Sequence, residues 1–543
     1  MRKLIFLLFT SLIFQSVFPC TNIIVTKGAS KDGSAFLFYT CDGEFLYHLK
    51  KYPAQDYKEG AFYYFKNYKG EVYGKIPQVK HTYATIGGHI NEFQLAIGET
   101  TFTGREELIN HSNFINYWEL MRLTLQRSKT AREAVEVMTS IVDKYGYGSS
   151  GESFSIVDKN EAWILEMIGT GKDGKGAIWV AVKIPDGTIA AHANKARIGE
   201  FPLGDPENCM YSKNVISFAI EKGYYDPTSG ESFKFNEVYC PSTPGNLRYC
   251  SSRVWSIFNR VSPSLELSMD YNRGVKGAER YPLYIKPDHK IGLKDMFALV
   301  RDHYEGTSID MTKGFDAGPY GNPNRIRPLY WTVDKVECAW ERPISTPNAA
   351  FSFVAQLRNW LPDEIGGVLW FGEDDTYSSC YLPIYNSVED IPEPYKIGDM
   401  KAFSWNSAWW TFNFVANYAN IRYDEMIKDI QYVQDSIENY YIGNQKTIED
   451  RALELYEADN RDEMITFLTE YCHTEATNLM KEWQTLGYSL VTKYNDGYIK
   501  DENGRAKAKG YSEEYRRDAL RNRSSVQLPD WDTNPKDNKA KNF

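Results

Sequence analysis

The chain has 543 residues, of which 42% are hydrophobic and 25% charged, enough for one large core or for two to three domains. Its net charge of -10 argues against a nucleic-acid partner. Eight cysteines in so long a chain argue against a disulfide scaffold. Eight histidines, with neither a His-Glu-x-x-His nor a Cys-x-x-Cys motif, give no metal-binding spacing, so we expect no metal or cofactor.

The first nineteen residues have the pattern of a secretory signal. Arg2 and Lys3 give a positive start, and Leu4 to Phe18 is mostly apolar. This run is shorter than the roughly 20 residues of a membrane span, so we expect no transmembrane segment, with an uncleaved anchor as the alternative. The sequence therefore predicts export to the periplasm or the extracellular space.

The end of this leader leaves three processing routes open. Signal peptidase prefers small residues, and Phe18-Pro19 before Cys20 does not provide them. A lipid-carrying cysteine, which would attach the protein to a membrane, also follows small residues. Self-cleavage before Cys20 is the third route.

A β-hairpin is predicted directly after the leader. Cys20 to Lys27 is rich in β-branched residues, Gly28 to Gly33 is a turn, and Ser34 to Asp42 is a second strand. Cys20 would be the first residue of this hairpin.

That position suits a cysteine nucleophile. A thiol attacks well only as a thiolate and therefore needs a base. If Cys20 is the first residue, its own α-amine, with an ordinary pKa near 7.7–8.0, can accept the thiol proton. Asp42 is the acidic residue best placed to orient that amine, and no histidine is required.

The segment resembles the start of the mature cysteine dipeptidases of the N-terminal-nucleophile (Ntn) hydrolase superfamily. The shared features are Cys20-Thr21, the Lys-x-Ala-Ser-x-Asp-Gly-Ser pattern at 27–34, and Asp42. Related penicillin and bile-salt amidases carry an arginine three residues before the aspartate, where this chain has Tyr39. The resemblance implies a catalytic Cys20 and Asp42, short peptide substrates and an α+β fold, the αββα sandwich.

The resemblance continues along the chain in the family order. Asn91 to Glu99 resembles a family strand, after which the amidases have an oxyanion-binding asparagine. Here Thr100 follows, as a candidate substrate contact or a plain strand-end residue. The 161–166 and 179–186 segments resemble two further family strands.

Three more candidates come from these matches. Glu166 is a candidate partner for the substrate amine, with an ordinary surface pair as the alternative. Asn194 matches the residue whose amide donates to the oxyanion in relatives, and read alone it is a turn residue. Arg253, in a family-like Arg-Val-Trp helix start, would lie near the nucleophile or bind a substrate carboxylate, or form a structural ion pair.

Two other features are interpreted as structural. Gly146 to Gly151 fits Gly-x-Gly-x-x-Gly, but a predicted helix precedes it and a strand follows, the reverse of a dinucleotide site. Strand alternation turns Cys41 away from Asp42 and makes it a buried core residue.

The expected domain organisation follows the change in pattern along the chain. After the 1–19 signal, residues 20–424 form the catalytic domain, with helices predicted at 114–126 and 130–144. Residues 425–499 form a helical extension over the core, and 500–543 a polar, flexible tail.

The leading hypothesis is a dipeptidase that works through a Cys20 thioester. One alternative keeps the mechanism with acyl amides as substrates. Another is a lipid-anchored binding protein without catalysis. Nothing in the sequence specifies an oligomeric state.

Overall fold

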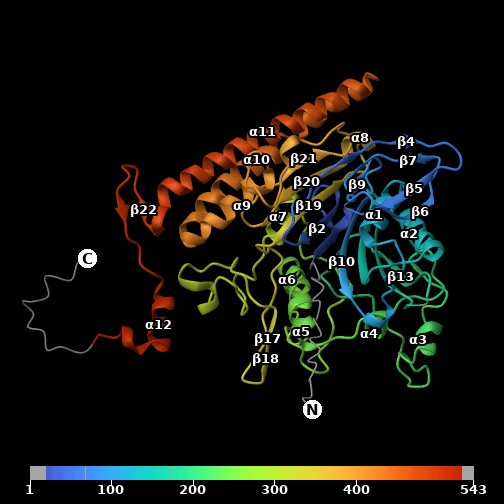
Figure 1. The fold of residues 1–543 in the computed structure, drawn as a ribbon, viewed down its shortest axis with the longest axis horizontal. Helices are drawn as coiled ribbons and strands as arrows, with labels where there is room; N and C mark the ends of the chain where they lie inside the picture. The colour runs from blue at the N-terminus through green and yellow to red at the C-terminus, as the bar shows by residue number, and fades with distance from the viewer. Residues whose placement is uncertain (1–19, 68, 173, 529–543) are drawn as a thin grey trace, which may run out of the picture.

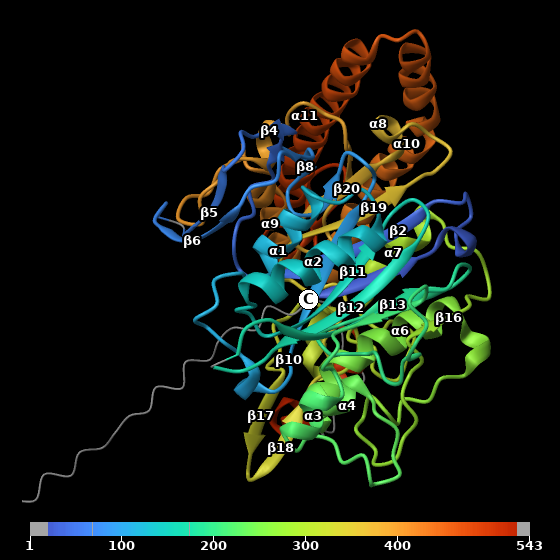
Figure 2. The ribbon, with the colours of Figure 1, turned by 90° about the vertical axis from the view of Figure 1, so that its right-hand side faces the viewer.

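The computed structural model describes residues 20–67, 69–172 and 174–528, so the predicted leader lies outside the described residues. Two antiparallel sheets stack face to face, and helices cover both outer faces (Figures 1 and 2). This four-layer arrangement confirms the predicted α+β class and its αββα order.

The first sheet contains the predicted hairpin at its centre. β1 pairs with β2 in a register that places Thr21 opposite Thr40 and Asn22 opposite Tyr39. Every residue of β1 is buried, because sheet neighbours flank it and layers cover both its faces. The strands in sheet order are β16 (Tyr284–Ile285), β14 (Ile189–His192), β1 (Thr21–Val25), β2 (Ala35–Asp42), β19 (Ala349–Leu357), β20 (Val368–Glu373) and β21 (Leu382–Tyr385).

The second sheet lies against the face of β1 and β2. A β-carbon at Gly98 would collide with Asn22 and Tyr39, so this glycine allows the two sheets to approach closely beside the start of β1. The strands in sheet order are β15 (Cys209–Tyr211), β13 (Ala177–Ile184), β12 (Ala162–Gly169), β11 (Gly151–Val157), β10 (Ala96–Thr103), β9 (Ile90–Asn91), β8 (Thr85–Ile86) and β3 (Lys51–Tyr52).

Two helices cover the outer face of the second sheet (Figure 2). They are α1 (Tyr117–Leu125) and α2 (Ala131–Tyr145), close to their predicted bounds. The Thr130 hydroxyl caps α2 by accepting from the Glu133 amide at 3.2 Å. Gly146 ends α2 with φ of 92°. β11 follows the glycine segment, which confirms that segment as a helix-stop loop.

The long C-terminal helices pack against the first sheet. α10 contacts α11, and α11 contacts β21 and α9 (Figure 1). Their buried residues recur at helical spacing, which is why the 425–499 region was predictable as helix. Together with the shorter α6 and α7, which also contact the first sheet, the helices on this side are α6 (Ser252–Val261), α7 (Leu293–Val300), α9 (Ala408–Tyr418), α10 (Tyr423–Glu457) and α11 (Arg461–Tyr494).

Short elements complete the fold. The helices are α3 (Ser217–Glu221), α4 (Phe235–Tyr239), α5 (Pro244–Asn246), α8 (Asp363–Gly366) and α12 (Glu513–Asn522). The two-stranded pairs are β4 (Gln55–Asp56) with β7 (His81–Thr82), β5 (Phe62–Lys66) with β6 (Val72–Pro77), β17 (Tyr330–Val333) with β18 (Val336–Ala339), and β22 (Ile499–Lys500) with β23 (Ala506–Lys507).

The described part of the region after residue 500, residues 501–528, is structured where a flexible tail was expected. It contains β23 and α12, and Lys509 forms ion pairs with Asp424 and Glu425. The Arg422 guanidinium donates to the Lys509 carbonyl at 2.7 Å. No residue of α12 is buried, so these polar contacts and the ring contact of Tyr511 with Tyr320, rather than an apolar stripe, hold this segment. A hydropathy pattern carries no signal for such contacts.

Candidate active site

Cys20 lies immediately before β1, in the layer between the two sheets. Its backbone nitrogen donates to Asn194 Oδ1 at 3.0 Å, and its Sγ lies 3.5 Å from Glu99 Oε1. The side chain is only 1% exposed. Burial, contact with the Cys41 thiol and the nearby Glu99 charge raise the Cys20 pKa well above its ordinary value. The thiol therefore needs a base before it can attack.

Asn194 holds the backbone of Cys20 from the loop after β14. Its Oδ1 accepts from both the Cys20 nitrogen and Arg253 Nη2, the latter at 2.9 Å. Its Nδ2 donates one hydrogen to the Thr101 carbonyl at 2.9 Å. The amide is thus fixed in one orientation, with its NH2 group directed toward β10 and a second hydrogen remaining on Nδ2.

Arg253 is fully buried near the start of α6 and ties three segments together. Nη1 donates to the Cys20 carbonyl at 2.8 Å and to the Thr21 hydroxyl at 2.9 Å. Nε donates to the Tyr249 carbonyl at 3.0 Å. With the bond to Asn194, the planar fork fixes Cys20 and Asn194 relative to each other.

Asp42 ends β2 in an ion pair with Arg342. Its carboxylate also accepts from the Thr40 hydroxyl at 2.8 Å. Burial raises the pKa of Asp42, and the charges of Arg342 and Arg253 oppose that shift. Sequence reasoning missed Arg342, because 300 residues separate it from Asp42 and no motif marks it.

Glu99 is a second acidic group at the site that sequence reasoning did not single out. Its Oε1 accepts from the Tyr39 hydroxyl at 2.6 Å, and its backbone carbonyl accepts from Asn22 Nδ2 at 2.7 Å. Tyr39 stands at the sequence position where the related amidases have an arginine, and here its neutral hydroxyl is the donor to Glu99. The available signal was the acidic residue that ends the family-like Asn91–Glu99 segment; in the structure Glu99 lies within β10.

Thr100 and Glu166 are engaged with the protein itself. The Thr100 hydroxyl lies 2.7 Å from His192 Nδ1. The Glu166 carboxylate accepts from the Arg197 amide at 2.5 Å and the Ile198 amide at 3.0 Å. Burial raises the pKa of Glu166 to about 7. These contacts make Glu166 a support for the loop that follows Asn194.

Cys41 is next to Cys20. One step beyond the Thr21–Thr40 pair, the β1–β2 register places these two cysteines opposite each other, and their side chains are in contact. The prediction of a buried residue turned away from Asp42 agrees with strand alternation. It did not include the contact with the nucleophile.

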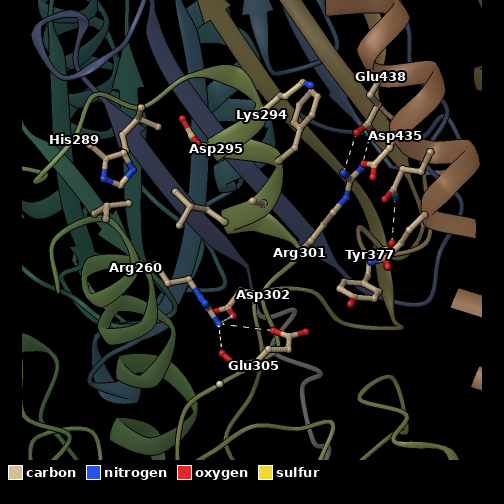
Figure 3. A pocket seen from close by; sticks show the side chains of 18 of the residues that line it. Arg260, His289, Lys294, Asp295, Arg301, Asp302, Glu305, Tyr377, Asp435 and Glu438 are labelled. Atoms are coloured by element: carbon tan, nitrogen blue, oxygen red, sulfur yellow. Dashed lines mark hydrogen bonds and ion pairs between the residues drawn. The ribbon is translucent and has the colours of Figure 1, made fainter. Parts of the chain in front are cut away.

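A separate cavity of about 990 Å³ opens between α6, α7 and α10 (Figure 3). Two ion pairs lie within its lining, with Arg260 and Asp302 joined at 2.5 Å and Arg301 and Glu438 at 2.6 Å. Neither Cys20 nor any of its hydrogen-bond partners named above lines this cavity, so the cavity is distinct from the Cys20 site.

The described residues were found to contain neither a metal-binding cluster nor a membrane-spanning helix. In the part of the chain that the structure describes, no group of three or more His, Cys, Asp or Glu side chains is arranged to hold a metal ion. None of the helices in that part is long and apolar enough to cross a membrane.

The two stacked sheets, covered by helices on both outer faces, define the αββα class of fold. The chain belongs to peptidase family C69, whose profile matches residues 48–436. Cys20 precedes the matched range.

Similar proteins carry dipeptidase names. A "Probable dipeptidase" of Salmonella dublin is 26% identical over 420 residues, covering 74% of this chain and 88% of the relative. A "Probable dipeptidase" of Latilactobacillus sakei is 25% identical over 494 residues, covering 87% and 95%. Penicillin V acylase from Agrobacterium tumefaciens matches 67% of this chain and 86% of its own, at 12% identity and a TM-score of 0.28, too low to argue from.

Proposed function

We propose that this protein is a dipeptidase whose nucleophile is Cys20, acting as the first residue of the processed chain. The observation that carries the proposal is the position of the Cys20 backbone nitrogen, 3.0 Å from Asn194 Oδ1. After removal of residues 1–19 this nitrogen would be an α-amine, fixed beside its own thiol. Family membership and the relatives' names support peptide-bond hydrolysis.

The reaction uses groups that are already oriented. The α-amine takes the Cys20 thiol proton, and the thiolate attacks the scissile carbonyl. The remaining Nδ2 hydrogen of Asn194 donates to the developing oxyanion, a contribution of about 2.7–4 kcal/mol for one such donor. The amine then protonates the leaving amine, and water hydrolyses the thioester.

Arg253 and Asp42 support this arrangement without taking part in the proton transfers. Arg253 fixes the Cys20 carbonyl and Asn194 Oδ1. Asp42 adds negative charge near Cys20, with Arg342 limiting that charge. We assign both as positioning residues.

The direct test is Cys20→Ala in the processed protein, with Cys209→Ala as a matched control. Cys209 is also buried but lies in β15 of the second sheet. We expect dipeptide hydrolysis to disappear in the first variant and to persist in the second. Full activity of Cys20→Ala would refute the proposal.

Export and processing belong to the same proposal. Mass spectrometry of the mature N-terminus should find a free Cys20 amine. A diacylglycerol adduct would instead favour a lipid-anchored binding protein. Faster hydrolysis of N-acylated than of free dipeptides would favour an amidase.

A further inference from the structure

A buried carboxyl pair lies beside the nucleophile. Glu99 of β10 and Glu152 of β11 are both fully buried, and their side chains are in hydrogen-bond contact. Glu99 Oε1 faces Cys20 Sγ at 3.5 Å, and Glu152 Oε1 accepts from the Thr101 hydroxyl at 2.7 Å. The pair therefore extends from the thiol into the second sheet.

This pair can carry at most one negative charge, and no ion pair joins either carboxyl to a cation among the described residues. Two carboxyl groups in contact share a proton, since both cannot ionise together. Burial and the neighbouring Glu99 charge raise the pKa of Glu152 well above its ordinary value. Oε2 of each carboxyl receives no donor from any other described residue. A buried charge in this state is costly unless a cation joins it.

The geometry of a peptide places such a cation at this point. In any amino acid, the α-nitrogen is about 2.5 Å from the carbonyl carbon of the same residue. Cys20 Sγ must reach that carbon when it attacks the first peptide bond. A carboxylate 3.5 Å from Sγ is thus within reach of the substrate's α-ammonium.

We propose that Glu99, sharing one negative charge with Glu152, binds the α-ammonium of the substrate's first residue and makes the enzyme select free over N-acylated amino termini. This inference rests on the proposed function. It differs from the sequence-based assignment of this role to Glu166, whose oxygens accept two backbone amides and the Ser153 hydroxyl. Glu99 is next to the nucleophile and still has an oxygen without a donor outside the pair.

A second source of positive charge is the α-amine of Cys20 itself. If Glu99 served only that amine, its loss would slow reactions with blocked and free substrates equally. A comparison of the two kinds of reagent separates these roles.

The test uses phenylalanine chloromethyl ketone and its N-acetyl derivative on the processed protein. Both alkylate a thiol without needing turnover, and mass spectrometry identifies the labelled residue. In the wild type we expect faster labelling of Cys20 by the free-amine reagent. Glu99→Gln should slow that reagent about 30-fold or more, as expected when one partner of a buried charge pair is removed.

The N-acetyl reagent should change less than threefold in Glu99→Gln. The matched control is Glu161→Gln in the turn between β11 and β12 of the same sheet, since Glu161 forms an ordinary ion pair with Lys183. The control should leave both rates unchanged. A wild-type preference that falls as the reagent's amine loses its proton would support the proposal without any variant.

Two outcomes would overturn the inference. An unchanged preference in Glu99→Gln would remove Glu99 from amine binding, and equal losses with both reagents would assign it to the enzyme's own amine. Failure of the proposed function is distinct, because Cys20 would then be labelled by neither reagent.

Discussion

Replacing Arg253 by lysine tests whether a planar fork at the start of α6 sets the catalytic geometry. Lysine keeps the charge but has one nitrogen, and it cannot reach both the Cys20 carbonyl and Asn194 Oδ1, which are bonded to different guanidinium nitrogens. With its nitrogen at the Nη1 position, lysine loses the Nη2 bond to Asn194 and the Nε bond to the Tyr249 carbonyl, and two hydrogen bonds from a charged donor, at about 1.5–3 kcal/mol each, amount to about 3–6 kcal/mol. Even the lower value corresponds to roughly a 100-fold change in rate.

Steady-state kinetics on a dipeptide provide the assay. We expect Arg253→Lys to lower kcat about 100-fold with little change in KM, because the lost bonds hold the nucleophile rather than the substrate. Arg260→Lys is the control on the same helix, since Arg260 is partly exposed and pairs with Asp302. An Arg253→Lys enzyme within threefold of wild-type kcat would refute the reasoning, provided that urea unfolding shows it folded.

Three further predictions concern buried titratable groups. His89 has no partner for either ring nitrogen among the described residues, and burial lowers its pKa to about 3. Below pH 6.5 the unfolded chain binds a proton at this histidine and the folded protein does not, so the free energy of unfolding should fall by about 2 kcal/mol between pH 7 and pH 5. His89→Phe should remove this fall in urea unfolding, and an unchanged pH dependence would contradict the prediction. Glu166, with a pKa near 7, stays protonated in the fold where the unfolded chain releases the proton, so wild-type stability should fall as pH rises from 4.5 to 7, by about 3 kcal/mol from this group. Glu166→Gln should remove that slope whatever its effect on overall stability, and a persisting slope would assign it elsewhere. Contact with Cys41 raises the pKa of Cys20, so Cys41→Ala should lower that pKa. The pH midpoint of Cys20 alkylation should then move down, whereas Cys209→Ala should leave this midpoint unchanged.

Local patterns predicted the elements that carry the site. The hairpin from Cys20 to Asp42, the helix at 130–144 and the start of α6 all depend on residues close in sequence, and the structure has them near the expected positions. Turn glycines and helix caps act over a few residues, so a single sequence is enough to recognise them.

The choice among acidic residues was not predictable in the same way. Glu99 and Glu166 are both buried carboxyls of one sheet, on β10 and β12 with β11 between them, each after an apolar run. Only the packing of the Arg197–Ile198 backbone onto Glu166, and of Cys20 onto Glu99, separates their environments. Sequence spacing contains no information on such long-range contacts.

Asn194 has a backbone φ of 53°, in the left-handed region that asparagine, aspartate and glycine tolerate best. Its side chain must also accept a bond from Cys20 and donate one to Thr101. Glycine adopts the positive φ but has no side-chain amide. Glutamine has the amide but does not favour the positive φ, and aspartate lacks the donor. Asparagine meets both demands with one short amide, so very few substitutions at position 194 are open to the protein as its sequence drifts.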